Sequence, residues 1–175
     1  MVVQPDSFNF SGVDMRREYG IKVISYDVLK PPLRPRKVLV PSHDGTHDLG
    51  AIYHDERELR IECDALERRL TREQIRELAG LLDKKGRIYL WDEPDKYYIG
   101  QIYKAPNLRY LGMAGHSFAL TFTCEPFAYG DVYDGPLPHI ISYAGTARTP
   151  ARLTITNTSN TGVNGVRIIV RVRKR

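Results

Sequence analysis

The clearest pattern in the chain is the strict alternation of residue types between Phe118 and Cys124. Every second residue in this stretch is large and apolar or a cysteine, while alanine and threonine lie between them. A period of two is typical of an antiparallel strand that buries one face. The run Leu59, Ile61 and Cys63 has the same period. Both stretches therefore predict half-buried strands.

Other strands are predicted by β-branched and aromatic runs that turn residues separate. They cover residues 21–28, 37–40, 51–53, 88–91 and 97–103, and further on residues 153–156 and 166–173.

One helix is expected, over about residues 71–83. Thr71 and Gln74 have the spacing of a capping box, in which each side chain bonds the other residue's backbone N–H. Ile75, Leu78, Ala79 and Leu82 follow at helical spacing and predict one apolar stripe that packs on a sheet.

The segment Lys30-Pro31-Pro32-Leu33-Arg34-Pro35-Arg36 interrupts regular structure, because proline cannot donate to a sheet ladder and restricts the residue before it. It predicts an extended segment that leads into a hairpin or long arm. At 175 residues the chain has room for one well-cored domain and an appendage. We predict a mainly β, α+β domain over residues 1–135, an antiparallel β-sandwich or split barrel. A short β segment over residues 136–175 must lean on that domain or on another chain.

Composition narrows the class of protein. Apolar residues make up 42% of the chain and charged residues 27%, and no apolar run is long enough to span a membrane. The N-terminus lacks the basic start and apolar core of a secretory signal, so we expect synthesis in a cytoplasm. Cys63 and Cys124 lie on the apolar phase of their strands and are expected to be buried free thiols.

The net charge of +5 is concentrated near the C-terminus, where residues 148–175 contain seven basic residues and no acidic one. Such a basic tail suits nucleic acid, an acidic partner surface or simply a solvated end. Its last members are Arg167, Arg171, Arg173, Lys174 and Arg175.

The chain contains little that indicates catalysis. His43, His47 and His54 are weak candidates for a metal site, but Pro41 and Gly45 predict a loop, where their spacing has no geometric meaning. No nucleophile elbow or phosphate-binding loop accompanies them, so no enzyme activity and no cofactor are predicted.

Tyrosines gather at Tyr97, Tyr98, Tyr103 and Tyr110. Together with basic residues they could stack single-stranded nucleic acid, but half-buried strands and subunit interfaces also favour tyrosine. We favour the second interpretation, because no RNA-binding motif or recognition helix accompanies them.

Over residues 6–130 the chain resembles the distal tail protein (Dit) family of siphophages and related prophage tails. An ordered set of segments carries the resemblance: Phe8-Asn9-Phe10-Ser11-Gly12, Glu18-Tyr19-Gly20-Ile21-Lys22-Val23, the proline-rich basic segment 32–37, residues 53–63, the helix 71–82, Asp92-Glu93-Pro94-Asp95-Lys96-Tyr97-Tyr98, and Phe118 to Pro126. None of these motifs is diagnostic alone.

The resemblance implies a structural virion protein of the phage tail or baseplate, assembled in the host cytoplasm. In this family the N-terminal domain forms a hexameric ring with a tail-tube-like fold, which joins the tube to the tail-tip proteins. An arm reaches the next subunit, and DNA passes through the lumen without sequence-specific binding. By resemblance residues 31–56 would be the arm, and no membrane insertion is expected. Predicted contacts with a subunit or partner are Arg34, Arg36, His43, Asp44, His47, Tyr97, Tyr98 and Tyr103.

Two features depart from the family pattern. Residues Pro41-Ser42-His43-Asp44-Gly45 stand where the family often has a Pro-Gly-Arg-x-Gly turn. The region from Ile140 looks like the start of a galectin-like domain but stops well short of a whole one. The alternatives are another tube or baseplate structural protein, a nucleic-acid-binding β module that uses the basic tail, or a metal-dependent enzyme built on the three histidines.

Overall fold

The computed structural model of the chain describes residues 3–28, 30–42, 44–50, 53–65, 69–104, 117–132, 135, 147, 154–162 and 164–165. The chain divides into two compact units, Met1–His139 and Ile140–Arg175. Residues 154–156 of the second unit, which the sequence predicted as a strand, have no regular secondary structure. The strand predicted over residues 166–173 lies outside the described residues. The boundary at 135/136 and the galectin-like assignment stay predictions.

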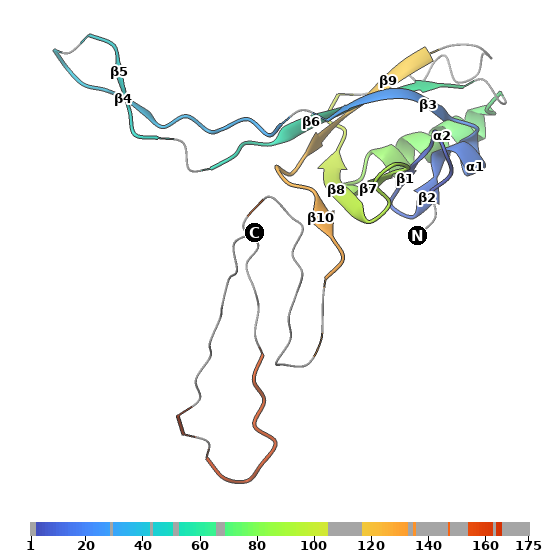
Figure 1. The fold of residues 1–175 in the computed structure, drawn as a ribbon. Coiled ribbons are helices and arrows are strands. Elements are labelled where there is room, and N and C mark those ends of the chain that lie inside the picture. Colours follow the sequence, from blue (N-terminus) through green and yellow to red (C-terminus); the bar gives the residue numbers. More distant parts are fainter. Residues whose placement is uncertain are drawn as a thin grey trace. The chain divides into compact units, whose positions relative to one another are not determined.

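The strands of the first unit are β1 (Phe8–Phe10), β2 (Val13–Asp14), β3 (Lys22–Val28), β4 (Lys37–Leu39), β5 (Thr46–Asp48), β6 (Arg57–Asp64), β7 (Gly86–Leu90), β8 (Lys96–Gln101), β9 (Ser117–Cys124) and β10 (Tyr129–Gly130). Its helices are α1 (Met15–Tyr19) and α2 (Arg72–Leu82). The main sheet has the order β2-β1-β7-β8-β9-β6-β3 with β10 beside β8, and β4 and β5 form a sheet of their own (Figure 1). These strands pair antiparallel, which confirms the mainly β, α+β class.

The ladder between β6 and β9 is the longest that the structure describes in the main sheet. It runs from Arg57 opposite Cys124 to Asp64 opposite Ser117 without a shift in register. Both strands alternate between buried and more exposed positions, as their sequences predicted. Because side chains alternate across a strand, one face of this pair enters the core. Its buried side chains are Leu59, Ile61, Cys63, Phe118, Leu120, Phe122 and Cys124.

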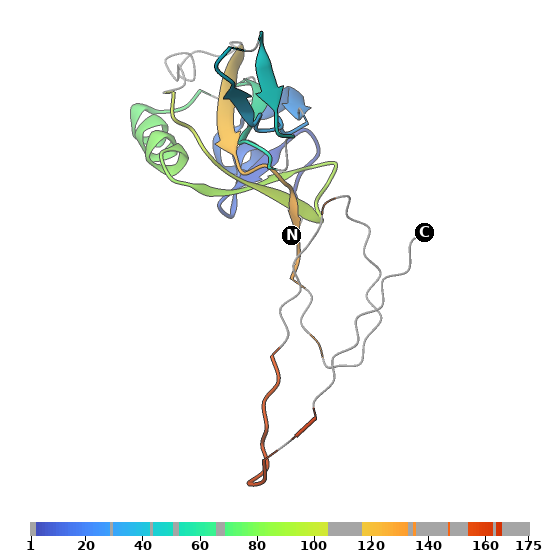
Figure 2. The same ribbon diagram turned by 90° about the vertical axis from the view of Figure 1, so that its left-hand side faces the viewer.

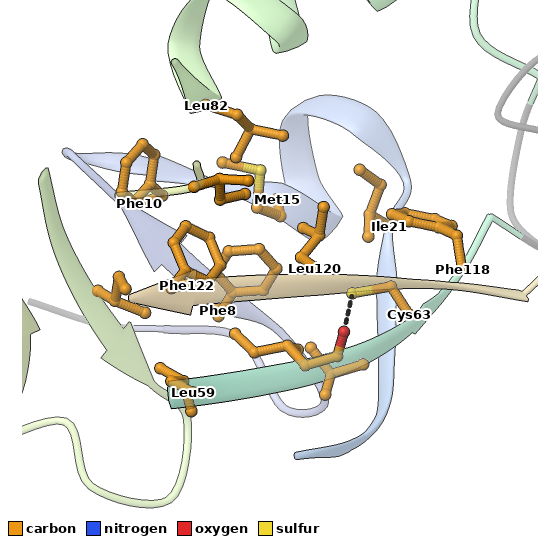
Figure 3. Packing of buried hydrophobic residues seen from close by; sticks show 14 of the residues in the cluster. Phe8, Phe10, Met15, Ile21, Leu59, Cys63, Leu82, Phe118, Leu120 and Phe122 are labelled. Atoms are coloured by element: carbon orange, nitrogen blue, oxygen red, sulfur yellow. Dashed lines mark hydrogen bonds between the residues drawn. The ribbon is translucent and has the colours of Figure 1, made fainter. Parts of the chain in front are cut away.

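The core is completed by residues from β1 and both helices. Phe122 meets Phe8 at a ring-centroid distance of 6.2 Å and Phe10 at 5.4 Å. Met15 from α1 and Leu82 from α2 lie beside these rings (Figure 3). Aromatic pairs in this range of distances add to the stability gained from burying their area. The sheet is therefore joined to its helices through one apolar cluster.

Helix α2 begins as predicted. The hydroxyl of Thr71 accepts the backbone N–H of Gln74 at 3.2 Å, and the Gln74 side chain accepts the Thr71 N–H at 3.0 Å. Leu78 and Leu82 are buried in the core, whereas Ala79, predicted as part of the same stripe, is exposed. Helix α2 (green) lies to one side of the strands when the molecule is viewed from the second direction (Figure 2).

The prediction of a single helix is wrong, because α1 forms a second one. Asp14 caps it by accepting hydrogen bonds from the backbone N–H groups of Arg16 and Arg17, and Gly20 ends it at a φ of 66°. Met15 is its one buried residue. A helix of five residues has too few positions to show an apolar period, so only its capping residues mark it in the sequence.

The main sheet curls so that its ends approach. The backbone N–H of Val23 in β3 donates to the carbonyl of Asp6, which precedes β1, at 2.8 Å. Tyr26 packs edge-on against Trp91 at 5.1 Å, and its hydroxyl donates to Asp92. Burial and the Asp92 carboxylate raise the pKa of Tyr26. These contacts join the edge strand β3 to elements near the opposite edge.

Both cysteines are free and buried, as predicted. Burial raises the pKa of Cys124 to about 12 and also raises that of Cys63. The Cys124 sulfur lies close to the backbone of β8, where a β-carbon added at Gly100 would come within 2.5 Å of it. Gly100 therefore allows β8 and β9 to approach each other.

We expect Gly100→Ala to lower the free energy of unfolding by about 1–3 kcal/mol, because it overpacks the core against Cys124. Gly80→Ala is the matched control. Gly80 lies inside α2 with nothing within 4 Å of an added β-carbon, so alanine there should stabilise the protein by about 0.5–1 kcal/mol. Urea unfolding of both variants measures the two effects. Equal stability of the variants would contradict the close β8–β9 approach.

Candidate assembly interface

The most distinctive surface is the arm, which we define as residues 30–42, 44–50 and 53–55. It continues the β3–β6 ladder. Val28 is opposite Leu59 in the main sheet, and Leu33 is opposite His54 in the arm. Each pair is five residues along its strand from the other, so the register does not change between sheet and arm. The arm is therefore a direct extension of two strands of the sheet (Figure 1).

Backbone bonds hold the base of the arm together. The N–H of Arg34 donates to the carbonyl of Tyr53 at 2.8 Å, and the N–H of Asp55 donates to that of Pro32 at 2.8 Å. The side chains of Arg34 and Asp55 also form an ion pair of 2.6 Å. Both are partly exposed, so the pair contributes little stability and mainly orients the two strands.

The outer part of the arm is the β4–β5 hairpin. Lys37 is opposite Asp48 and Leu39 is opposite Thr46. Its tip includes Gly45, whose φ of +86° is one that glycine adopts readily. The predicted hairpin or long arm is thus a two-stranded ribbon.

Exposed apolar side chains distinguish the arm. Every residue in 32–42 and 44–50 that the structure describes is exposed. Leu39 has 74% of its surface exposed and Tyr53 has 63%. Large apolar side chains gathered on a protrusion, with no core beneath them, are typical of a surface that another protein covers. The set comprises Leu33, Val38, Leu39, Val40, Leu49 and Tyr53.

The apolar residues point from both faces of the ribbon. Val38 is opposite His47 and Leu39 is opposite Thr46, and successive side chains of a strand face opposite ways. Val38 and Leu39 therefore lie on different faces. Three consecutive apolar residues cannot all enter one core from a strand. The run Val38-Leu39-Val40 is therefore a sequence signal of an exposed apolar surface, which our predictions from the sequence did not use.

Several residues predicted for an interface do lie on the arm. Arg36, Asp44 and His47 are exposed there, and Arg34 is exposed but engaged with Asp55. His43 lies outside the described residues. The role of these side chains in an interface stays a prediction.

The tyrosines predicted for the interface are in different environments. Tyr103 has 70% of its surface exposed, whereas Tyr97 and Tyr98 are buried. Tyr97 lies between the rings of Tyr89 at 5.3 Å and Tyr129 at 5.8 Å. The side chain of Tyr98 belongs to the core. Tyr97 and Tyr98 are thus engaged within their own subunit.

The other candidate chemistry is not assembled where the structure can be described. His47 lies on β5 and His54 at the base of the arm, and the described residues include no group of three His, Cys, Asp or Glu side chains suited to a metal. The basic tail, Arg167 to Arg175, lies outside these residues. No described helix is long and apolar enough to cross a membrane.

A polar cluster holds the segment that follows β9. The Glu125 carboxylate pairs with the Lys85 ammonium at 2.7 Å and accepts the Tyr129 hydroxyl at 2.6 Å. The hydrogen bonds from Lys85 and Tyr129 lower the pKa of Glu125. The bond to Glu125, with burial, raises the pKa of Tyr129 to about 12. Phe127, between them in sequence, packs on His54 of the arm at 5.1 Å.

Comparison with known proteins supports the fold. No protein-family model matches the chain, and no curated protein matches it. A similar solved structure is that of the SPP1 Dit (gp 19.1) protein, described as a paradigm of the hub adsorption apparatus in phages that infect Gram-positive bacteria. The TM-score is 0.53 and the sequence identity 23%. The match covers 71% of this chain and 52% of that one, so this chain corresponds to about half of the SPP1 protein. At this identity the likeness shows a Dit-like fold.

The lowered pKa of Glu125 makes its contribution to stability depend on pH. A carboxyl whose pKa is lower in the folded protein stabilises it above the unfolded pKa, and this stabilisation is lost as the pH falls through the folded value. Glu125→Gln should therefore have a lower urea midpoint than the unchanged protein at pH 7, and the difference should shrink as the pH falls below the unfolded pKa of a glutamate. Salt should weaken the effect, because the pair is partly exposed.

The matched control is Glu58→Gln, at an exposed carboxylate of β6 that makes no ion pair with any described residue. A difference between Glu125→Gln and the unchanged protein that stays constant from pH 7 to pH 3 would contradict the role of the ionised carboxylate.

Proposed function

We propose that this chain is a structural, non-catalytic component of a phage tail, which forms a hexameric ring between the tail tube and the tail-tip or baseplate proteins. The observation that carries the proposal is the arm, a two-stranded extension of the sheet with six large exposed apolar side chains. The Dit-like fold supports the choice of a tail component. Virion localisation, after assembly in the host cytoplasm, follows from that role.

The arm favours contact with a second copy of the chain. It extends from one edge of the subunit, and we place it on a different surface of its neighbour. Such a head-to-tail contact generates a ring when the rotation between subunits closes. Burial of Leu39 alone would contribute about 1.5–3 kcal/mol to each contact, since it has 74% of its surface exposed in the single chain.

Passage of DNA through a ring limits the positive charge that the lumen can carry. Neutralising many phosphates with lysine and arginine would hold the DNA strongly, and genome exit requires weak, sequence-independent contact. We therefore infer that the basic tail contacts partner proteins or belongs to a larger C-terminal domain. Other residues would line the lumen. A tube protein on one side of the ring and tail-tip proteins on the other are the partners that this role requires.

The test is the mass in solution of the full chain, together with negative-stain images. We expect rings of six copies. Leu39→Asp should shift the protein towards monomers and raise the dissociation constant at least tenfold, because the carboxylate would have to lose its water in the contact. Since Leu39 is exposed in the single chain, the urea midpoint of the monomer should not change.

Val132→Asp is the matched control, since Val132 is a large aliphatic residue with 88% of its surface exposed, outside the arm. It should leave the rings intact. A strict monomer at high concentration would overturn the proposed ring. If the Leu39→Asp variant still forms rings, the arm does not form the contact between subunits.

A further inference from the structure

The segment after β9 is bonded to the main sheet at several points. It starts at Glu125, whose backbone N–H donates to the carbonyl of Ile99 at 2.8 Å, and ends in β10, which pairs with β8. We call residues 125–130 the connector, because they precede the part of the chain that leads to the second unit. Pro126 fixes its own φ and confines Glu125 to extended backbone. The start of the connector is therefore stiff.

Both ends of the connector are fastened to the main sheet. At one end the Glu125 carboxylate bonds Lys85, which immediately precedes β7. At the other the Tyr129 ring stacks on Tyr97 at 5.8 Å while its hydroxyl bonds Glu125 at 2.6 Å. Because Tyr129 bonds back to Glu125, the two ends of the connector are also held to each other.

Phe127 lies between these attachments and points to a different partner. The residue has 38% of its surface exposed, and its ring meets the imidazole of His54 at a centroid distance of 5.1 Å and an interplanar angle of 68°. His54 is opposite Leu33 at the base of the arm, next to the Asp55 that pairs with Arg34. The arm and the connector, which are about 70 residues apart in the sequence, thus share one edge-to-face contact.

We propose that the His54–Phe127 pair couples the arm to the connector, so that fixing the arm on a neighbouring molecule also fixes the segment through which the chain leaves the first unit. The base of the arm cannot shift without moving His54, and Phe127 cannot follow without straining the Glu125 and Tyr129 attachments. Coupling of this kind is reciprocal, so loosening the connector also loosens the base of the arm.

The reciprocity is tested by amide hydrogen exchange on the full chain at low concentration. Phe127→Ala should raise the exchange of the Arg34 and Asp55 amides, which bond across the base of the arm, by about twofold to tenfold. His54→Ala should raise the exchange of the Glu125 amide and of β10 by a similar factor. The double variant should exceed neither single variant, as expected for two residues that act through one contact.

Tyr53→Ala is the matched control, because Tyr53 immediately precedes His54 in the arm and has 63% of its surface exposed. It should leave the exchange of Glu125 unchanged. Phe127→Leu keeps the apolar bulk but loses the ring, so it separates the ring contact from a general loss of packing. Its effect on the exchange of the Arg34 and Asp55 amides should equal that of Phe127→Ala. The proposal is overturned if each substitution speeds exchange only within its own segment.

The second arm of the test rests on the proposed function. In assembled rings the exchange of Glu125 and β10 should be slower than in the single chain, and Phe127→Ala should abolish that slowing while rings still form. Equal slowing with and without the Phe127 ring overturns the coupling. If the unchanged protein forms no rings, the proposed function fails, while the comparison on the single chain still decides the coupling.

Discussion

The β3–β6 ladder is the constraint on which both the core and the arm depend. Its register is set where Leu59 and Ile61 enter the apolar core, because a slip of one residue would turn them to the solvent face. The same register continues to Leu33 and His54. The core therefore determines which side chains of the arm share a face, although the arm buries little of its own surface. An element with almost no packing of its own takes its geometry from the sheet.

The register does change further out. Arg34 is bonded to Tyr53, but Arg36 is bonded to Leu49, so the returning strand has two more residues than the outgoing one over this interval. Gly50, next to Leu49, has a φ of +83°, which glycine adopts without strain. The outer hairpin therefore has a register of its own, shifted by two residues from that of the base of the arm.

Sequence reasoning succeeded where one strong pattern acted alone. The alternation over Phe118 to Cys124 and the capping box at Thr71 each predicted an element that the structure contains. It failed for α1, which depends on the cap at Asp14 and the left-handed Gly20, and for residues 154–156, whose β-branched residues form no strand. Propensity is a weak guide where no packing partner decides the outcome.

The candidate interface was only partly predictable. The prolines indicate an arm, and Arg34, Arg36, Asp44 and His47 are exposed there. The apolar residues that dominate its surface were overlooked, because exposure depends on where the rest of the sheet lies. Residue type alone suggests Tyr97 and Tyr98 for an interface, yet their positions on β8 bury both within the subunit. The contact between His54 and Phe127 joins segments that no local pattern could connect.

The two thiols have a consequence for the durability of the protein. Thiolates, rather than thiols, react with oxidants, and a pKa of about 12 keeps Cys124 protonated at any ordinary pH. Cys63 is fully buried beside the same apolar side chains. A tail component of the proposed kind leaves the reducing host cytoplasm and must persist in air-saturated water. Burial of both sulfurs in the core would protect them from oxidation in that role.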